Sequence, residues 1–287
     1  MVDAGRVESV DEFVKLVCNL ARRWQKGTWD PRKHSSWLPW FRGEENADWE
    51  TALKPKLFRT THQLKAILRQ EQDLRLEFKR RGSQFAGDAR PSDHWEWYFL
   101  MQHYGVPTRL LDWSDGALVA LYFALKPPRP TRRGRPPDAA VYMVDPWWLN
   151  NLVYKELPIA KAMRPLGTAL PSWEEAAAYL PKDEFDNDIV GPKLPLAIDP
   201  SHVSSRFAAQ RSRFTIFGRD VDGLQTLSKM SKKKGHRLCR VLIKRSAASK
   251  MRRDLATCGV SESSIFTDLE GFGRELNSLF DELWMPR

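Results

Sequence analysis

Apolar residues recur every three to four positions over long stretches of this chain, and polar residues fill the positions between them. Between residues 8 and 25, Val10, Phe13, Val17 and Leu20 follow this period, which places their side chains on one face of a helix. The same period, combined with capping residues, predicts helices at 61–81, 93–104 and 115–125, near 172–180 and 246–257, and at 268–283.

Shorter apolar runs predict strands. Residues 139–144 read AAVYMV and stop at Asp145 and Pro146, as a buried strand does. Residues 37–43, 213–217 and 238–243 are further predicted strands. Because strands and helices are mixed without regular alternation, we expect an α+β fold, in which a small mixed sheet is packed by helices.

The length and composition suit one main domain. The chain has 287 residues, of which 42% are hydrophobic, and this is enough to bury one sizeable core. We expect residues 1–29 to form an N-terminal helical segment and residues 30–287 to form the main domain. Within it, residues 127–138 (PPRPTRRGRPPD) combine proline with arginine and predict a disordered basic loop.

The sequence also bears on the compartment. No apolar run reaches the roughly 18–20 residues of a membrane helix, and the N-terminus has no signal-peptide pattern. Cys18, Cys239 and Cys258 are odd in number and far apart, which favours reduced thiols over disulfides or a metal site. We therefore expect a cytoplasmic protein with no membrane partner and no bound metal.

The net charge of +10 favours an anionic partner. An anionic small molecule or a nucleotide is the first expectation. Nucleic acid stays open as a partner, because the basic loop could either contact it or be a solvated insertion. The residues do not specify the oligomeric state.

One segment, residues 102–114, concentrates polar side chains between two apolar helices. Polar groups in such surroundings must be satisfied by one another or by a ligand. We expect Arg109 and Asp112 to be buried near a helix start and to pair with each other, and Ser114 to cap a helix at 115–125. A helix N-terminus beside an arginine is a typical phosphate site. The candidate residues here are Gln102, His103, Tyr104, Thr108, Arg109, Asp112 and Ser114.

Two other segments carry candidate chemistry. Arg42 followed by Gly43 ends a predicted strand, where the glycine would let the backbone approach a ligand. The segment 206–216 carries three arginines, Arg206, Arg211 and Arg213, at the start of another predicted strand, and these could form one rim of an anion site. Surface turns would explain both segments equally well. We predict that one cleft brings together Arg42, His103, Arg109, Asp112 and Gln210.

These segments together resemble the FRG-domain family, named for its Phe/Tyr-Arg-Gly motif. Phe41-Arg42-Gly43 matches the opening motif, and the run from Gln102 through Ser114 to Ala124 matches the core. The resemblance extends over roughly residues 30–275, so residues 30–287 form an FRG-type domain on this interpretation. Ser212 departs from the family, which usually has glycine there.

The same segments are more distantly similar to mono-ADP-ribosyltransferases of the arginine–serine–glutamate type. The resemblance implies that Arg42 holds the pyrophosphate of NAD and that Ser114 or Asp112 orients the nicotinamide ribose. Gln210 stands where these enzymes have glutamate, which leaves open whether the protein turns NAD over. The implied catalytic residues are Gln210, Asp112 and His103, and the implied cofactor-binding residues are Arg42, Gly43, Gln102, Tyr104, Thr108, Arg109, Ser114 and Arg206.

Three functional hypotheses follow. The first is an NAD-binding, ADP-ribosyltransferase-like protein that acts as a toxin or antiphage-defence effector, as a transferase or an NAD glycohydrolase. The second is a metal-dependent nuclease that uses His103 and Asp112, although no paired carboxylates stand at a suggestive spacing. The third is a non-catalytic module that binds a nucleotide or nucleic acid.

Overall fold

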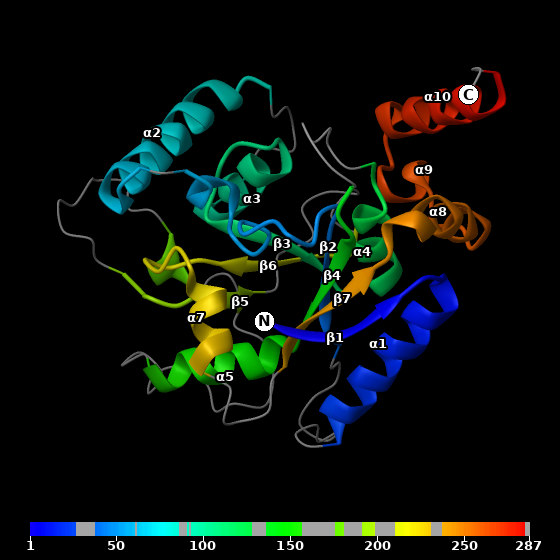
Figure 1. Cartoon of the computed structure of the whole chain (residues 1–287). Coiled ribbons are helices and arrows are strands. Elements are labelled where there is room, and N and C mark those ends of the chain that lie inside the picture. The colour runs from blue at the N-terminus through cyan, green and yellow to red at the C-terminus, as the bar shows by residue number, and fades with distance from the viewer. Residues whose placement is uncertain are drawn as a thin grey trace.

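The computed structural model describes residues 1–26, 38–60, 62–85, 91, 93–127, 136–156, 176–180, 191–198, 210–230 and 237–284. Within these residues, seven strands form one sheet in the order β1-β7-β4-β2-β3-β6-β5 (Figure 1). Neighbouring strands run antiparallel, except that β1 and β7 are parallel. The strands are β1 (Val2–Val7), β2 (Trp40–Glu44), β3 (Leu110–Ser114), β4 (Ala139–Val144), β5 (Leu196–Ile198), β6 (Ser212–Ile216) and β7 (Leu238–Ile243).

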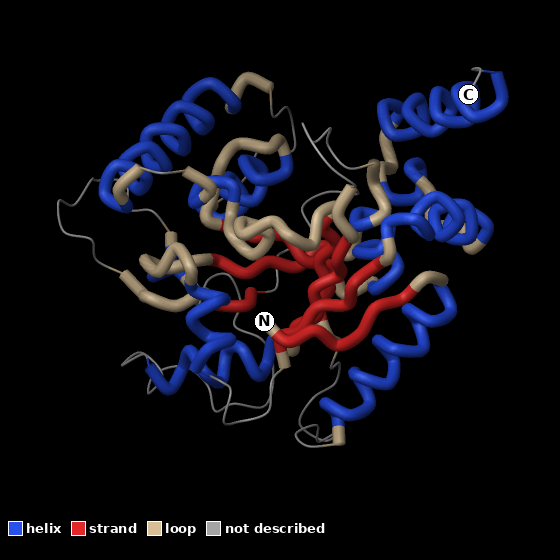
Figure 2. The backbone as a smooth tube through the Cα atoms, viewed as in Figure 1, coloured by secondary structure: helices blue, strands red, loops and turns tan. Residues whose placement is uncertain are grey.

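Helices surround this central sheet, so the predicted α+β fold is confirmed (Figure 2). The α-helices are α1 (Val10–Gln25), α2 (Leu64–Gly82), α3 (His94–His103), α4 (Ala117–Ala124), α5 (Pro146–Glu156), α7 (Gly223–Met230), α8 (Ala248–Thr257), α9 (Glu262–Ile265) and α10 (Leu269–Trp284). Short 3₁₀ helices are η1 (Lys56–Phe58), η4 (Ala177–Tyr179) and η6 (Arg245–Ala247).

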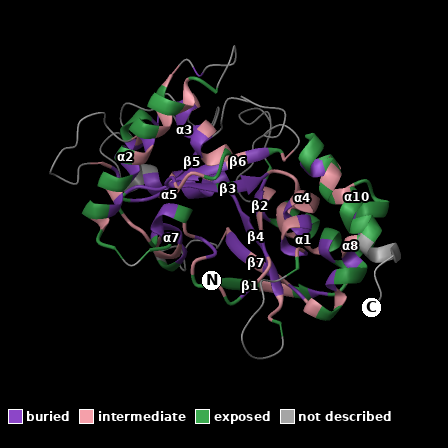
Figure 3. Ribbon diagram, turned by 90° about the horizontal axis from the view of Figure 1, so that it is seen from above, coloured by how far each residue is buried: buried purple, intermediate pink, exposed green. Residues whose placement is uncertain are grey.

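Strand β4 lies inside the sheet, between β7 and β2, and is buried on both faces (Figure 3). Its residues alternate between two hydrophobic clusters, since successive side chains of a strand point to opposite faces. Val141 and Met143 pack in one cluster with residues of α1, α4 and α8. Tyr142 and Val144 pack in the other, with residues of α3, α5 and α7. This double burial explains why the run is apolar at every position.

The sheet is weakly joined between β2 and β3. Strand β2 pairs with β4 at five positions but with β3 only through Phe41 and Ser114. Strand β3 in turn pairs with β6 at five positions. Because ladder hydrogen bonds keep strands close together, a single residue pair allows β2 and β3 to diverge on one side of it. The residues beyond this pair line the pocket described below.

Several elements differ from the prediction. The segment predicted to link two helices contains the strand β3, so Ser114 ends a strand rather than capping a helix, and Gly116 is the N-cap residue of α4. Strand β1 was not predicted, because its pattern is polar and only Val7 in it is buried, as befits an edge strand. Elements α5, β5 and α7 were also missed. Near 172–180 the described part of the predicted helix is the short η4.

The two ends of the predicted basic loop fall partly within the described residues, while 128–135 lie outside them. Asp138 is anchored in three ways. Its carboxylate pairs with Arg6 at 2.6 Å and accepts a hydrogen bond from the Arg245 backbone N–H at 3.1 Å, and its carbonyl accepts one from the Ala47 N–H at 2.8 Å. This end of the segment is therefore part of the folded structure.

Candidate functional site

A pocket of about 430 Å³ lies where β2 and β3 diverge. Strand β2, the C-terminal end of α3, strand β3, helix α4 and the residues before β6 all contribute side chains to its wall. The pocket brings together seven of the predicted site residues, namely Arg42, Gly43, Gln102, His103, Asp112, Ser114 and Gln210. Tyr104, Thr108 and Arg109 are not among its lining residues, and Arg206 lies outside the described part of the chain.

Arg42 joins the two sides of the split sheet. Its Nη1 donates to the Asp112 carbonyl on β3 at 2.8 Å, its Nε donates to the Ala52 carbonyl at 3.0 Å, and its Nη2 pairs with Glu44. A guanidinium carries five N–H groups, so these three acceptors leave two for a ligand. Arg42 is therefore first a structural bridge between β2 and β3. Only its two remaining N–H groups are available to bind an anion.

Gly43 is required by the packing of a helix. A Cβ atom at this position would lie 1.9 Å from the Ala120 carbonyl oxygen and 2.6 Å from the Ala124 backbone nitrogen, both in α4. Real Cβ atoms essentially never come this close to backbone atoms. The glycine of the Phe-Arg-Gly motif thus lets α4 cross β2, which differs from the predicted close approach of a ligand.

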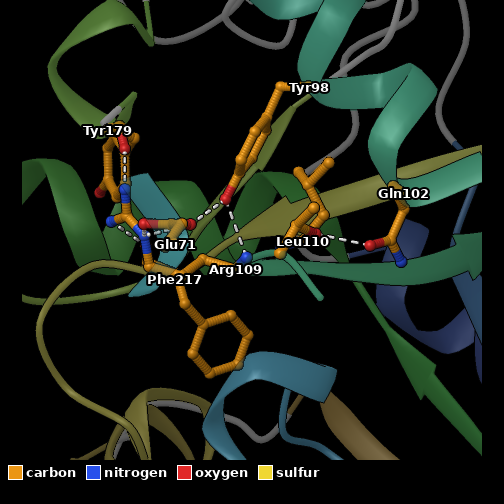
Figure 4. A network of polar contacts seen from close by, with 8 residues as sticks. Glu71, Tyr98, Gln102, Arg109, Leu110, Tyr179 and Phe217 are labelled. Carbon is orange, nitrogen blue, oxygen red and sulfur yellow. Dashed lines mark hydrogen bonds and ion pairs between the residues drawn. The ribbon is translucent and has the colours of Figure 1, made fainter. Parts of the chain in front are cut away.

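Arg109 takes part in a buried network away from the pocket (Figure 4). Its Nε donates to both carboxylate oxygens of Glu71, at 2.8 and 3.0 Å. Its two Nη atoms donate to the carbonyls of Phe217 at 3.0 Å and Tyr179 at 2.5 Å. The Tyr98 hydroxyl donates to Glu71 and accepts a hydrogen bond from the Arg109 backbone N–H. This network ties α2, α3, η4 and the end of β6 to the start of β3.

The predicted pairing of Arg109 with Asp112 is wrong, and so is the predicted burial of Asp112, which is exposed. The two residues are three apart, a spacing that shares a face in a helix but falls on opposite faces of an extended chain. Because 110–114 form a strand, Arg109 points into the core and Asp112 points toward the pocket.

The network shifts two pKa values. Burial and the neighbouring Glu71 carboxylate raise the pKa of Tyr98 well above its usual range, so the phenol stays a hydrogen-bond donor. Burial alone would lower the pKa of Arg109, but the charge and hydrogen-bond interactions with Glu71 and Tyr98 together outweigh burial and raise this pKa. Arg109 is a permanently charged part of the core.

Ser114 and Gln210 connect β3 to the chain before β6. The Ser114 hydroxyl donates to the Gln210 carbonyl at 2.8 Å and accepts from the Gly116 N–H at 3.0 Å. Asp115 pairs with Arg211 and, at 2.7 Å, with Arg213. The Nε2 atom of Gln210 is buried and has no hydrogen-bond partner among the described residues, so this part of the pocket wall carries an unused polar group.

Thr108 and Gln102 form a short chain of hydrogen bonds that ends at Asp112. The Thr108 hydroxyl donates to Gln102 Oε1 at 2.5 Å and accepts from the Leu110 N–H at 3.1 Å. Gln102 Nε2 then donates to Asp112 Oδ2 at 2.7 Å. Thr108 therefore acts behind the pocket wall.

The pocket also has lining residues that the sequence analysis did not single out as ligands. Trp49 and Phe123 are aromatic, whereas Arg59 and Lys126 are cationic. The nitrogen of Lys126 lies over the Phe123 ring, 5.0 Å from its centre. Trp49 follows the Phe41-Arg42-Gly43 motif by six residues. No local pattern marked Arg59 or Lys126, which reach the site only through the folding of the chain.

Two features are absent from the described residues. No group of three or more His, Cys, Asp or Glu residues there is arranged to hold a metal ion. No helix in that part of the structure has the length and apolar character to cross a membrane.

The architecture and the pocket define an α+β protein with a polar and aromatic cavity at a split in its sheet. Residues 38–133, which include β2, α3, β3 and α4, match the FRG domain family, and the chain therefore carries an FRG domain. The match contains the Phe41-Arg42-Gly43 motif and the run from Gln102 to Ser114, whereas Gln210 lies beyond it. Neither the curated proteins nor the solved structures contain a significant match to this chain.

Proposed function

We propose that the pocket binds NAD or a closely related nucleotide, and that the protein is ADP-ribosyltransferase-like with slow or no turnover. One observation carries the proposal. Arg42, Ser114 and Gln210, which stand at the three positions implied by the resemblance to arginine–serine–glutamate transferases, come from three distant segments and line the same pocket. Such convergence is what a dinucleotide site of this kind requires.

The chemistry of the wall supports a dinucleotide. A volume of about 430 Å³ falls within the range of small-molecule sites, roughly 300–1,000 Å³. Trp49 and Phe123 supply aromatic surface for a base or a nicotinamide ring. Both charge signs are present in the wall, since Arg42, Arg59 and Lys126 accompany Glu44, Glu45 and Asp112. A ligand that is itself mixed in charge, with an anionic pyrophosphate and a cationic nicotinamide ring, suits this wall better than a polyanion does.

In this proposal the residues have separate roles. The two N–H groups left on Arg42 meet the pyrophosphate, with Arg59 and Lys126 as further cations of the wall. Ser114 keeps the segment of Gln210 in place. The Gln210 amide meets a ribose hydroxyl or the carboxamide of the ligand, which would satisfy its buried Nε2 atom.

Position 210 decides between an enzyme and a binding module. An amide forms hydrogen bonds but carries no charge to stabilise the cation that develops as nicotinamide leaves. Loss of one electrostatic contact of this kind costs about 10²–10³ in rate. We therefore expect slow or absent release of nicotinamide by the natural protein, and a rise of that order in Gln210→Glu. An NAD-consuming reaction would fit the role of toxin or defence effector.

The test compares NAD binding by calorimetry and nicotinamide release for the natural protein, Gln210→Glu and Gln210→Ala. Gln70→Glu, on the exposed side of α2, is the matched control and should behave like the natural protein. Gln210→Ala should bind NAD more weakly. The proposal fails if NAD binds none of these proteins, or if its binding is indifferent to residue 210.

A further inference from the structure

The pocket contains three carboxylates in its wall, and their surroundings differ. Glu44 pairs with Arg42 and lies 3.9 Å from Arg59. Glu45 interacts electrostatically with Arg245. Asp112 has no cationic partner among the described residues, and its carboxylate accepts a hydrogen bond only from the neutral amide of Gln102. Within the described residues, therefore, no ion pair neutralises the carboxylate of Asp112, although Arg42, Arg59 and Lys126 line the same pocket.

The orientation of this carboxylate is nevertheless specified. Thr108 is fully buried, and its hydroxyl is held on one side by the Leu110 N–H and on the other by Gln102 Oε1. Since the oxygen of the Gln102 amide accepts from Thr108, its nitrogen must face Asp112. One oxygen of Asp112 is bound in this way, and the residue lines the pocket. An exposed carboxylate that served only solubility would need no such support.

We infer that Asp112 recognises positive charge in the ligand, and that Thr108 and Gln102 are positioning residues that hold it for this purpose. The inference rests on the proposed function and names the form of the ligand, which is the oxidised dinucleotide. The nicotinamide ring of NAD⁺ carries a positive charge, whereas the reduced ring of NADH is neutral. A fixed carboxylate beside the ring favours the first form over the second.

The size of the effect follows from the exposure of Asp112. Two opposite charges about 4 Å apart attract strongly in a protein interior, but solvent weakens the attraction near the surface. We expect NAD⁺ to bind about tenfold more tightly than NADH, a difference of about 1.4 kcal/mol.

The experiment measures dissociation constants of NAD⁺ and NADH by calorimetry for matched variants. Asp112→Asn keeps the shape of the side chain and removes its charge, so the ratio of the two constants should fall from about ten to about one. Asp73→Asn, an exposed aspartate on α2 away from the pocket, is the control and should keep the ratio. Equal affinity of the natural protein for both dinucleotides, or an unchanged ratio in Asp112→Asn, overturns the inference while leaving the proposed function in place. If neither NAD⁺ nor NADH binds the natural protein, both the inference and the proposed function are overturned.

The positioning chain has its own test. Thr108→Val removes the hydroxyl with little change in volume, and it should lower the ratio, whereas Thr108→Ser keeps the hydroxyl and should preserve it. If Thr108→Val does not fold, Gln102→Met breaks the same chain from a less buried position. A ratio near ten in a folded Thr108→Val or Gln102→Met variant overturns the positioning role.

Discussion

The buried network around Arg109 makes a strong prediction about stability. Replacing Arg109 with methionine keeps much of the side-chain volume but removes the only cation paired with Glu71 in the described structure. The Glu71 carboxylate is 1% exposed and would keep only the Tyr98 hydroxyl as a donor among the contacts described above, and the carbonyls of Phe217 and Tyr179 would each lose a donor. The variant should therefore be strongly destabilised.

The magnitude follows from these contacts. Removing one partner of a buried ion pair costs about 3–5 kcal/mol, because the other charge stays buried and uncompensated. Against a typical total stability of about 5–15 kcal/mol this is a large fraction. For a chain of this size it corresponds to a decrease of about 6–20 °C in melting temperature.

Thermal unfolding followed by tryptophan fluorescence measures the effect. The pair of Arg80 and Glu77 on the same helix α2 is the control, since both side chains are largely exposed, at 71% and 48%. Arg80→Met should cost less than about 1 kcal/mol. The double variant Arg109→Met with Glu71→Leu should recover part of the loss, because no unpaired charge remains. Near-natural melting of Arg109→Met, or a double variant as unstable as the sum of the single ones, would refute this account.

Three further predictions concern glycine packing and the thiols. Gly43→Ala should destabilise the fold by more than about 2 kcal/mol, since the added Cβ falls 1.9 Å from a carbonyl oxygen of α4. Gly273→Ala is the control, because its added Cβ meets no atom within 4 Å and should not destabilise the fold. Urea unfolding distinguishes the two variants, and equal unfolding midpoints would contradict the packing role of Gly43. Cys18 and Cys258 are exposed and Cys239 is buried, so a maleimide should label two thiols in the folded protein and three in denaturant; rapid labelling of three in the native state would contradict this. Burial raises the pKa of Cys239 from 9.0 to about 12, so the stability contributed by its neutral thiol is intact below pH 9 and is lost as the pH rises toward 12. Cys239→Ala should therefore lose less stability than the natural protein over that interval. Identical dependence of unfolding free energy on pH in the two proteins would rule this out.

Much of the fold could be predicted from local pattern. Helices α1, α2 and α3 and strands β4, β6 and β7 were predicted close to their observed bounds. The start of α3 was marked by Asp93, whose carboxylate accepts a hydrogen bond from the Glu96 N–H at 2.8 Å. Such signals are readable because they depend on residues within one or two turns of each other.

The segment 110–114 shows the limit of predicting secondary structure from local sequence pattern. Its sequence LLDWS has no simple alternation, because one face meets the core and the other meets both the core and the pocket. What makes it a strand is pairing with β6, about a hundred residues later in the chain. A long-range pairing of this kind leaves little trace in the segment itself.

The sequence by itself determined the α+β class, the FRG motifs and the concentration of polar residues in 102–114, since these depend on composition and short spacing. Only the tertiary structure decided what each of those residues does. Strand geometry sends Arg109 into the core to meet Glu71, which is 38 residues away, and turns Asp112 to the pocket. The packing of α4 against β2 explains Gly43, and the folding of distant segments brings in Arg59 and Lys126. The physical reason is the same in each case: the partner of a buried or converging side chain is chosen by three-dimensional packing, which sequence spacing does not encode.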